Sequence, residues 1–82
     1  MTELSTHTRK ELAHRSSDDI DVTLIWVQND AEYEAVVCVC DRREGAYFEI
    51  PTKPYLALDV YYHPFAYRSF STVDYEDSRI AA

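Results

Sequence analysis

Leu58-Asp59-Val60-Tyr61-Tyr62-His63-Pro64-Phe65-Ala66-Tyr67 is the stretch around which the rest of the chain is organised. It places four aromatic residues, a histidine and a proline within ten positions. The spacing of Tyr55, Leu58 and Tyr62, together with the pair Leu58 and Tyr61, predicts a short amphipathic helix that covers a sheet with these side chains. The helix should end near Tyr62, because the residue before Pro64 avoids helical backbone.

The chain before this stretch predicts three strands, over residues 20–28, 32–41 and 46–50. Apolar and β-branched residues occupy both faces of the first two strands, so we expect cover on both sides of the sheet. Short polar segments separate the strands and favour hairpins. The second of these segments ends at Gly45, the only glycine, where a left-handed backbone is expected.

Both ends of the chain are polar. Thr8 and Glu11 match a capping box, which predicts a short helix over about residues 9–15. We therefore divide the chain into a polar segment (1–17), one folded domain (18–70) and an acidic flexible tail (71–82). The predicted fold class is α+β: a three-stranded antiparallel meander followed by a short helix, with a short helix at the N-terminus.

Charge and composition restrict the class of protein. Fifteen acidic residues outnumber eight basic ones among 82, for a net charge of −7. This balance disfavours direct binding to nucleic acid and to anionic membranes. Cys38 and Cys40, one residue apart on a strand, are poorly placed to pair with each other and indicate a reducing compartment. No signal peptide or membrane helix is evident, so a cytoplasmic protein is expected.

The order of several motifs resembles a family of short uncharacterised actinobacterial proteins. The resemblance rests on Asp-x-Ile-x-Val-x-Leu-x-Trp at 18–26 and on Leu-Asp-x-aromatic-x-His-Pro-aromatic-Ala-Tyr at 58–67. It covers residues 11–67. Asp19 stands where the family usually has glycine, and Tyr61-Tyr62 where it has an aromatic residue followed by histidine. The resemblance implies an organisation and a source, and no activity.

Candidate chemistry centres on His63. With Tyr67 or Asp59 it could form an acid–base pair, since histidine titrates near neutrality. The alternative that we favour is structural: His63 caps the helix end by bonding a free carbonyl. Cys38, Cys40 and His63 lack the fourth ligand and the spacing of a zinc site. We therefore predict no metal, no cofactor and no catalytic residue.

The predicted function is that of a non-enzymatic protein-interaction or regulatory module. The candidate binding surface is the aromatic cluster, because tyrosine combines apolar area with a polar tip. It comprises Tyr61, Tyr62, His63, Phe65 and Tyr67. The expected partner is another protein or a second copy of the chain. Two alternatives remain: a small ligand-binding protein or enzyme using His63 with Tyr67 or Asp59, and an acidic mimic of nucleic acid.

Overall fold

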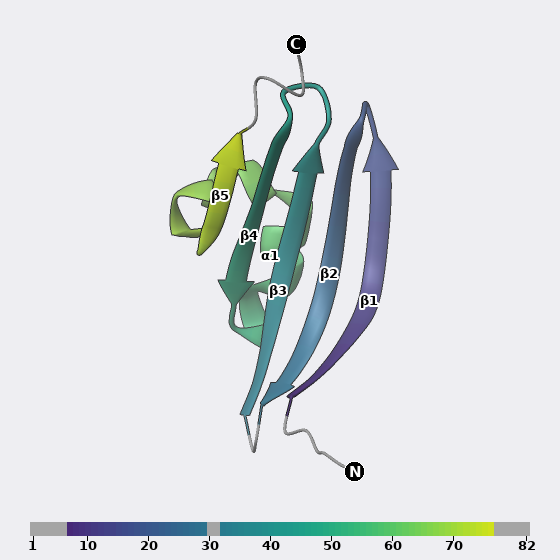
Figure 1. Ribbon diagram of the computed structural model, residues 1–82. Coiled ribbons are helices and arrows are strands. Elements are labelled where there is room, and N and C mark those ends of the chain that lie inside the picture. Colours follow the sequence, from purple (N-terminus) through teal and green to yellow (C-terminus); the bar gives the residue numbers. More distant parts are fainter. Residues whose placement is uncertain (1–6, 30–31, 77–82) are drawn as a thin grey trace.

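A computed structural model describes residues 7–29 and 32–76 of the chain. Within this part, five antiparallel strands form one sheet in chain order, and the helical segments lie behind it on one face (Figure 1). The strands are β1 (His7–Ser17), β2 (Ile20–Asn29), β3 (Glu32–Asp41), β4 (Ala46–Thr52) and β5 (Val73–Glu76). The α+β class is confirmed, but the sheet has five strands where three were predicted.

The two central strands explain why the chain folds around a sheet. β2 and β3 pair along their whole length, with Val22 opposite Val39 and Leu24 opposite Val37. All four side chains are at most 5% exposed. Burying a residue of this size contributes about 1.5–3 kcal/mol. The apolar and β-branched residues that predicted these strands thus pair in a register that brings Val22, Leu24, Val37 and Val39 to the same buried face.

The predicted N-terminal helix is wrong: residues 9–15 belong to β1. An isolated helix this short is marginal in water. As part of β1, the same residues pair with β2 and supply hydrogen-bond partners to its main chain. The two strands pair at ten positions, from His7 opposite Asn29 to Ser17 opposite Ile20. The register shifts by one between Glu11 and Ala13, which leaves Leu12 in a β-bulge with its side chain half exposed.

A two-residue turn joins β1 to β2. Asp18 and Asp19 both have positive φ, 54° and 66°. This pair of left-handed residues matches the twist of a tight hairpin and is normally filled by Asn-Gly or Asp-Gly. The turn touches the loop between β3 and β4, since the Arg42 N–H donates to the Asp19 carbonyl oxygen at 2.9 Å. In that loop Gly45 has φ 66°, so the expected left-handed backbone is confirmed.

The last two strands differ from the prediction. The third predicted strand was expected to end before Pro51, and no strand was expected in the tail over residues 71–82. β4 continues through Pro51 to Thr52. The Thr72 N–H donates to the Glu49 carbonyl oxygen, so the main-chain groups of Glu49 point away from β3. Those of Pro51, two residues further along the strand, point the same way. β5 pairs only with residues 46–49, so the missing N–H of Pro51 faces an edge without a strand.

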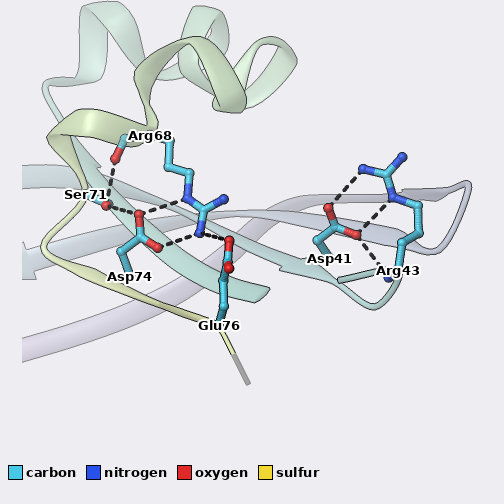
Figure 2. A network of polar contacts seen from close by, with 6 residues as sticks. All are labelled: Asp41, Arg43, Arg68, Ser71, Asp74 and Glu76. Atoms are coloured by element: carbon cyan, nitrogen blue, oxygen red, sulfur yellow. Dashed lines mark hydrogen bonds and ion pairs between the residues drawn. The ribbon is translucent and has the colours of Figure 1, made fainter. Parts of the chain in front are cut away.

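β5 itself lies in the segment predicted to be a flexible acidic tail. Figure 2 shows what holds it: Arg68 donates to Asp74 through Nε at 2.9 Å and through Nη2 at 2.6 Å. Ser71 donates from its hydroxyl to the Arg68 carbonyl oxygen at 2.7 Å. The Arg68 guanidinium also lies over the Phe48 ring, 4.6 Å from its centre. One arginine thus joins β5 to the core. Residues 77–82 lie outside the described part.

The helical layer consists of a 3-10 helix η1 (Pro54–Leu56), the helix α1 (Ala57–Tyr62) and a second 3-10 helix η2 (Pro64–Phe70). The predicted helix end at Tyr62 is confirmed. Its buried face agrees with the predicted one at Tyr61 alone. Ala57, Val60 and Tyr61 pack on the sheet at 6%, 1% and 5% exposure. In the described part, no helix is long and apolar enough to cross a membrane.

Candidate functional site

Helix α1 has an apolar side that faces solvent as well as one that faces the sheet. Leu58 and Tyr62, one helical turn apart, are 61% and 59% exposed. Tyr55, at the preceding turn, is 83% exposed. Phe65 lies just past the helix end and is 45% exposed. We call the set Tyr55, Leu58, Tyr62, His63 and Phe65 the outer helical surface.

The structure divides the five residues that the sequence nominated as a binding surface. Tyr62, His63 and Phe65 are exposed and lie on the outer helical surface. Tyr61 belongs to the hydrophobic core, so it does not line any surface. Tyr67 is half buried and donates its hydroxyl hydrogen to the Asp59 carboxylate. This hydrogen bond raises the pKa of Tyr67 above its usual range, because losing the proton would leave two negative charges together.

Arg15, and not His63, satisfies the end of α1. Nη2 of Arg15 donates to the carbonyl oxygen of Tyr61 at 2.9 Å and reaches that of Tyr62 at 3.5 Å. Its guanidinium lies 5.4 Å from the centre of the Tyr61 ring. A cation at the C-terminal end of a helix is favoured by the helix dipole. The side chain of His63 is exposed, and only its main-chain N–H closes the helix, on the carbonyl oxygen of Asp59 at 2.9 Å.

Sequence reasoning missed Arg15 because the contact depends on β1. In the strand, Arg15 sits opposite Val22, on the face that α1 covers. A helix over residues 9–15 would have placed it elsewhere. The one sequence signal was the tight turn that follows. A hairpin at Asp18 and Asp19 pairs the residues before it with β2, and so it places Arg15 opposite Val22. The Nε atom of Arg15 is buried and has no hydrogen-bond partner among residues 7–29 and 32–76.

A cavity of about 400 Å³ opens beside this helix end. Its walls include Tyr62, His63 and Phe65 from the helical layer, with Arg15 and Arg43 from the sheet and its loop. Apolar and aromatic side chains therefore meet two arginines and the carboxylate of Asp18 in one hollow. Both guanidinium groups also donate hydrogen bonds within the protein, Arg15 to the end of α1 and Arg43 to Asp41.

Arg43 is held at this cavity by Asp41, the one buried acidic residue of the described part. The Arg43 main-chain N–H and Nε donate to Oδ1 of Asp41, both at 3.0 Å, and Nη2 donates to Oδ2 at 2.9 Å (Figure 2). These hydrogen bonds hold the pKa of Asp41 below its usual range, in spite of burial. The pair fixes the loop between β3 and β4.

A second cavity, of about 270 Å³, lies at the other end of the helical layer. Its lining is mostly apolar and includes Ile50, Leu56, Tyr67 and Phe70. Tyr67 thus lines this cavity and bonds Asp59, while His63 lines the first one. The structure does not assemble His63 and Tyr67 into one acid–base site.

The two thiols lie on the far side of the sheet from α1. Cys38 and Cys40 are both free and half buried on β3. Burial raises the pKa of the Cys38 thiol, so it stays protonated at neutral pH. Among residues 7–29 and 32–76, no group of three or more His, Cys, Asp or Glu side chains is arranged to hold a metal ion.

No family model, no curated protein sequence and no solved structure matches the chain. The likeness to short actinobacterial proteins therefore stays a prediction from the motifs.

Proposed function

We propose that the chain is a non-enzymatic protein-interaction module that binds a partner with its outer helical surface. The observation that carries the proposal is the exposure of Leu58 and Tyr62 on a helix whose opposite side is already packed. A surface helix of a small protein usually exposes polar residues on its outer side. Aromatic and large aliphatic residues left at the solvent side are typical of the centre of a binding surface.

The cavity beside the helix end adds specificity to this surface. Tyr62, His63 and Phe65 belong both to the outer helical surface and to the cavity wall. A partner side chain that enters the cavity would meet Arg15 and Arg43 below it. This arrangement favours a partner segment with an apolar residue next to a carboxylate, because the arginine guanidinium pairs with carboxylates.

The test compares two matched variants of exposed leucines. Leu58→Asp places a charge at the centre of the outer helical surface, and Leu12→Asp places the same charge on β1, where Leu12 is 50% exposed. Each protein is immobilised and used to capture partners from a lysate of the source cell. We expect a partner that wild type and Leu12→Asp retain and Leu58→Asp loses.

The captured partner is then purified and titrated by calorimetry. A negative heat-capacity change on binding is expected, since apolar area is buried. Equal binding by Leu58→Asp and wild type would contradict the proposal. A basic DNA-binding partner that Leu58→Asp retains and that salt releases would instead favour the alternative, an acidic mimic of nucleic acid.

A second candidate function, binding of a small organic anion, is favoured by the first cavity alone. Its volume of about 400 Å³ falls in the range of small-molecule sites. His63 lines it with an exposed side chain. Titration of small aromatic carboxylates by NMR tests this candidate. We expect chemical-shift changes at His63 and Phe65 that are smaller in Arg15→Met. Unchanged chemical shifts in the wild-type protein would contradict this candidate function.

A further inference from the structure

The face of the sheet opposite α1 is apolar at its centre. An antiparallel sheet with one solvated face normally alternates apolar and polar residues along each strand. β2 and β3 do not. On β2, the side chains of Ile25 and Val27 point to the face opposite the core. On β3, those of Val36, Cys38 and Cys40 point to the same face.

The register joins these residues into one patch. Ile25 lies opposite Val36, and Val36 lies opposite Pro51 on β4. Cys38 and Cys40 continue the patch along β3. We call the set Ile25, Val36, Cys38, Cys40 and Pro51 the uncovered sheet face. Val36 is only 8% exposed and the other four are partly buried, so neighbouring side chains of the sheet already enclose the patch.

Nothing in the described part lies over this face. The buried residues of α1 pack with Val37 and Phe48 on the other side of the sheet, and η2 follows through Phe65, whose ring centre is 5.4 Å from that of Phe48. Figure 1 looks onto the uncovered sheet face, with the helical layer behind the strands.

We propose that the uncovered sheet face binds a second copy of this chain, face to face about a two-fold axis. The two sheets then form a sandwich with a shared apolar layer, about 10 Å apart. This inference concerns the face opposite the outer helical surface and does not depend on the function proposed above.

The size of the face fits a dimer. The two longer principal extents of the molecule are 44 and 29 Å, which gives its broad side a projected area on the order of 1,000 Å². A stable interface of standard size buries about 800 Å² on each partner. An 82-residue chain also buries a smaller share of its surface than a larger domain does, so a second apolar layer adds substantially to its stability.

Charged side chains of both signs lie beside the apolar patch, the basic ones on the edge strand β1 and most of the acidic ones on the inner strands. The basic members on β1 are Arg9 and His14, and the acidic ones on β1 to β4 are Glu11, Asp21, Glu34 and Glu49.

Net charge gives the proposal a distinctive salt dependence. Two copies with a charge of −7 each repel one another at long range. Salt screens this repulsion, with a Debye length of about 10 Å at 0.1 M and about 3 Å at 1 M. The dimer therefore becomes tighter as salt is added, whereas a complex held by opposite charges becomes weaker.

The experiment measures mass by sedimentation velocity over a concentration series of about 1–500 µM, at low and at high salt. Ile25→Lys places a charge on the uncovered sheet face, and Leu58→Asp is the matched control on the opposite side of the molecule. Circular dichroism verifies that both variants are folded. We expect a wild-type dimer that tightens with salt, the same dimer in Leu58→Asp, and a dissociation constant at least about tenfold weaker in Ile25→Lys.

The reactivity of the two thiols provides a second measurement. It uses the wild-type protein alone, so it does not require that Ile25→Lys folds. Maleimide labelling of Cys38 and Cys40 should slow as the wild-type concentration rises, because the dimer covers both. A monomer at every concentration and salt would overturn the proposal. So would a dimer that Ile25→Lys preserves and Leu58→Asp loses, or thiol protection that is the same at all concentrations.

Discussion

Nη2 of Arg15 on β1 lies 2.9 Å from the carbonyl oxygen of Tyr61, although the two residues are 46 positions apart in the chain. The contact joins the first strand of the sheet to the last turn of α1. It gives the helix end a cation and a hydrogen-bond donor from another element, and so it couples the formation of β1 to that of the helical layer.

Arg15→Met should therefore destabilise the protein more than His63→Ala. Methionine keeps the apolar stem and removes the charge and the donor. The expected cost is about 1–2 kcal/mol, because a partly buried carbonyl loses its partner and the helix dipole loses a cation. For His63→Ala, whose side chain is exposed, the expected change is within about 0.5 kcal/mol. Urea unfolding measures both, and the reverse order would restore the helix-cap role to His63.

Asp41→Asn should make stability less sensitive to acid. The pKa of Asp41 is lowered in the folded protein by hydrogen bonds from Arg43. Its ionised form therefore contributes stability above the unfolded pKa of about 3.9, and this contribution is lost as pH falls through the lower folded value. The expected cost of the variant is about 1.5–3 kcal/mol at pH 7.

The difference in the free energy of unfolding between wild type and Asp41→Asn should then become smaller below about pH 4, as the wild-type carboxylate takes up a proton. Urea midpoints from pH 7 to pH 3 measure it. A double-mutant cycle with Arg43→Gln provides the control, since two residues in one hydrogen-bonded pair should give non-additive changes. A gap of constant size over this pH range would contradict the role of the Asp41–Arg43 pair.

Asp19→Gly should stabilise the protein. Asp19 has φ 66° in the tight turn between β1 and β2, a conformation in which glycine avoids the clash of a Cβ atom. The expected gain is about 0.5–1 kcal/mol after the loss of an exposed ion pair with Arg42. For a domain of this size, that gain raises Tm by several degrees, about 2–8 °C.

The matched control for this turn is Ser17→Gly, in the extended strand just before it. There glycine adds only flexibility to the unfolded chain, so Tm should fall. A lower Tm for Asp19→Gly as well would mean that the turn does not form as described. Calorimetry of the two variants settles the comparison.

Asp74→Asn should loosen β5 without unfolding the rest. Asp74 receives two hydrogen bonds from Arg68 and one from Ser71 (Figure 2). The strand pairs over only four residues, so it depends on this network. We expect hydrogen exchange in β5 to accelerate about tenfold while β2 and β3 stay protected. Glu76→Gln, which removes a single contact of 3.4 Å, is the milder control. Equal acceleration throughout the sheet would contradict this picture.

The central part of the fold could be predicted because its signals are local. Apolar and β-branched runs indicated β2 and β3, and Gly45 and Pro64 marked a turn and a helix end. β1 was missed because its polar residues form a strand only when β2 offers an edge, and pairing between strands does not show in local propensity. β5 was missed for a related reason: four polar residues become a strand through Arg68, which belongs to another element.

The candidate site was predicted in part for the same reasons. Counting large apolar residues favoured Tyr55, Leu58, Tyr61 and Tyr62 as the buried side of the helix, and of these four only Tyr61 is buried. The sheet is instead covered by a side that contains Ala57, whose small side chain lets the backbone approach closely. Tyr62, His63 and Phe65 were nominated as surface residues and are exposed, whereas Arg15 could be found only after β1 was known to be a strand.

The β-bulge at Leu12 has a consequence for how far the sheet can grow. β1 is an edge strand of eleven residues, long enough to template further strands in an open-ended fibre. The register shift between Glu11 and Ala13 divides that edge into two short stretches whose side chains alternate out of phase. An incoming strand that matches one stretch mismatches the other. The bulge thereby protects the protein against amyloid-like stacking along its longest free edge.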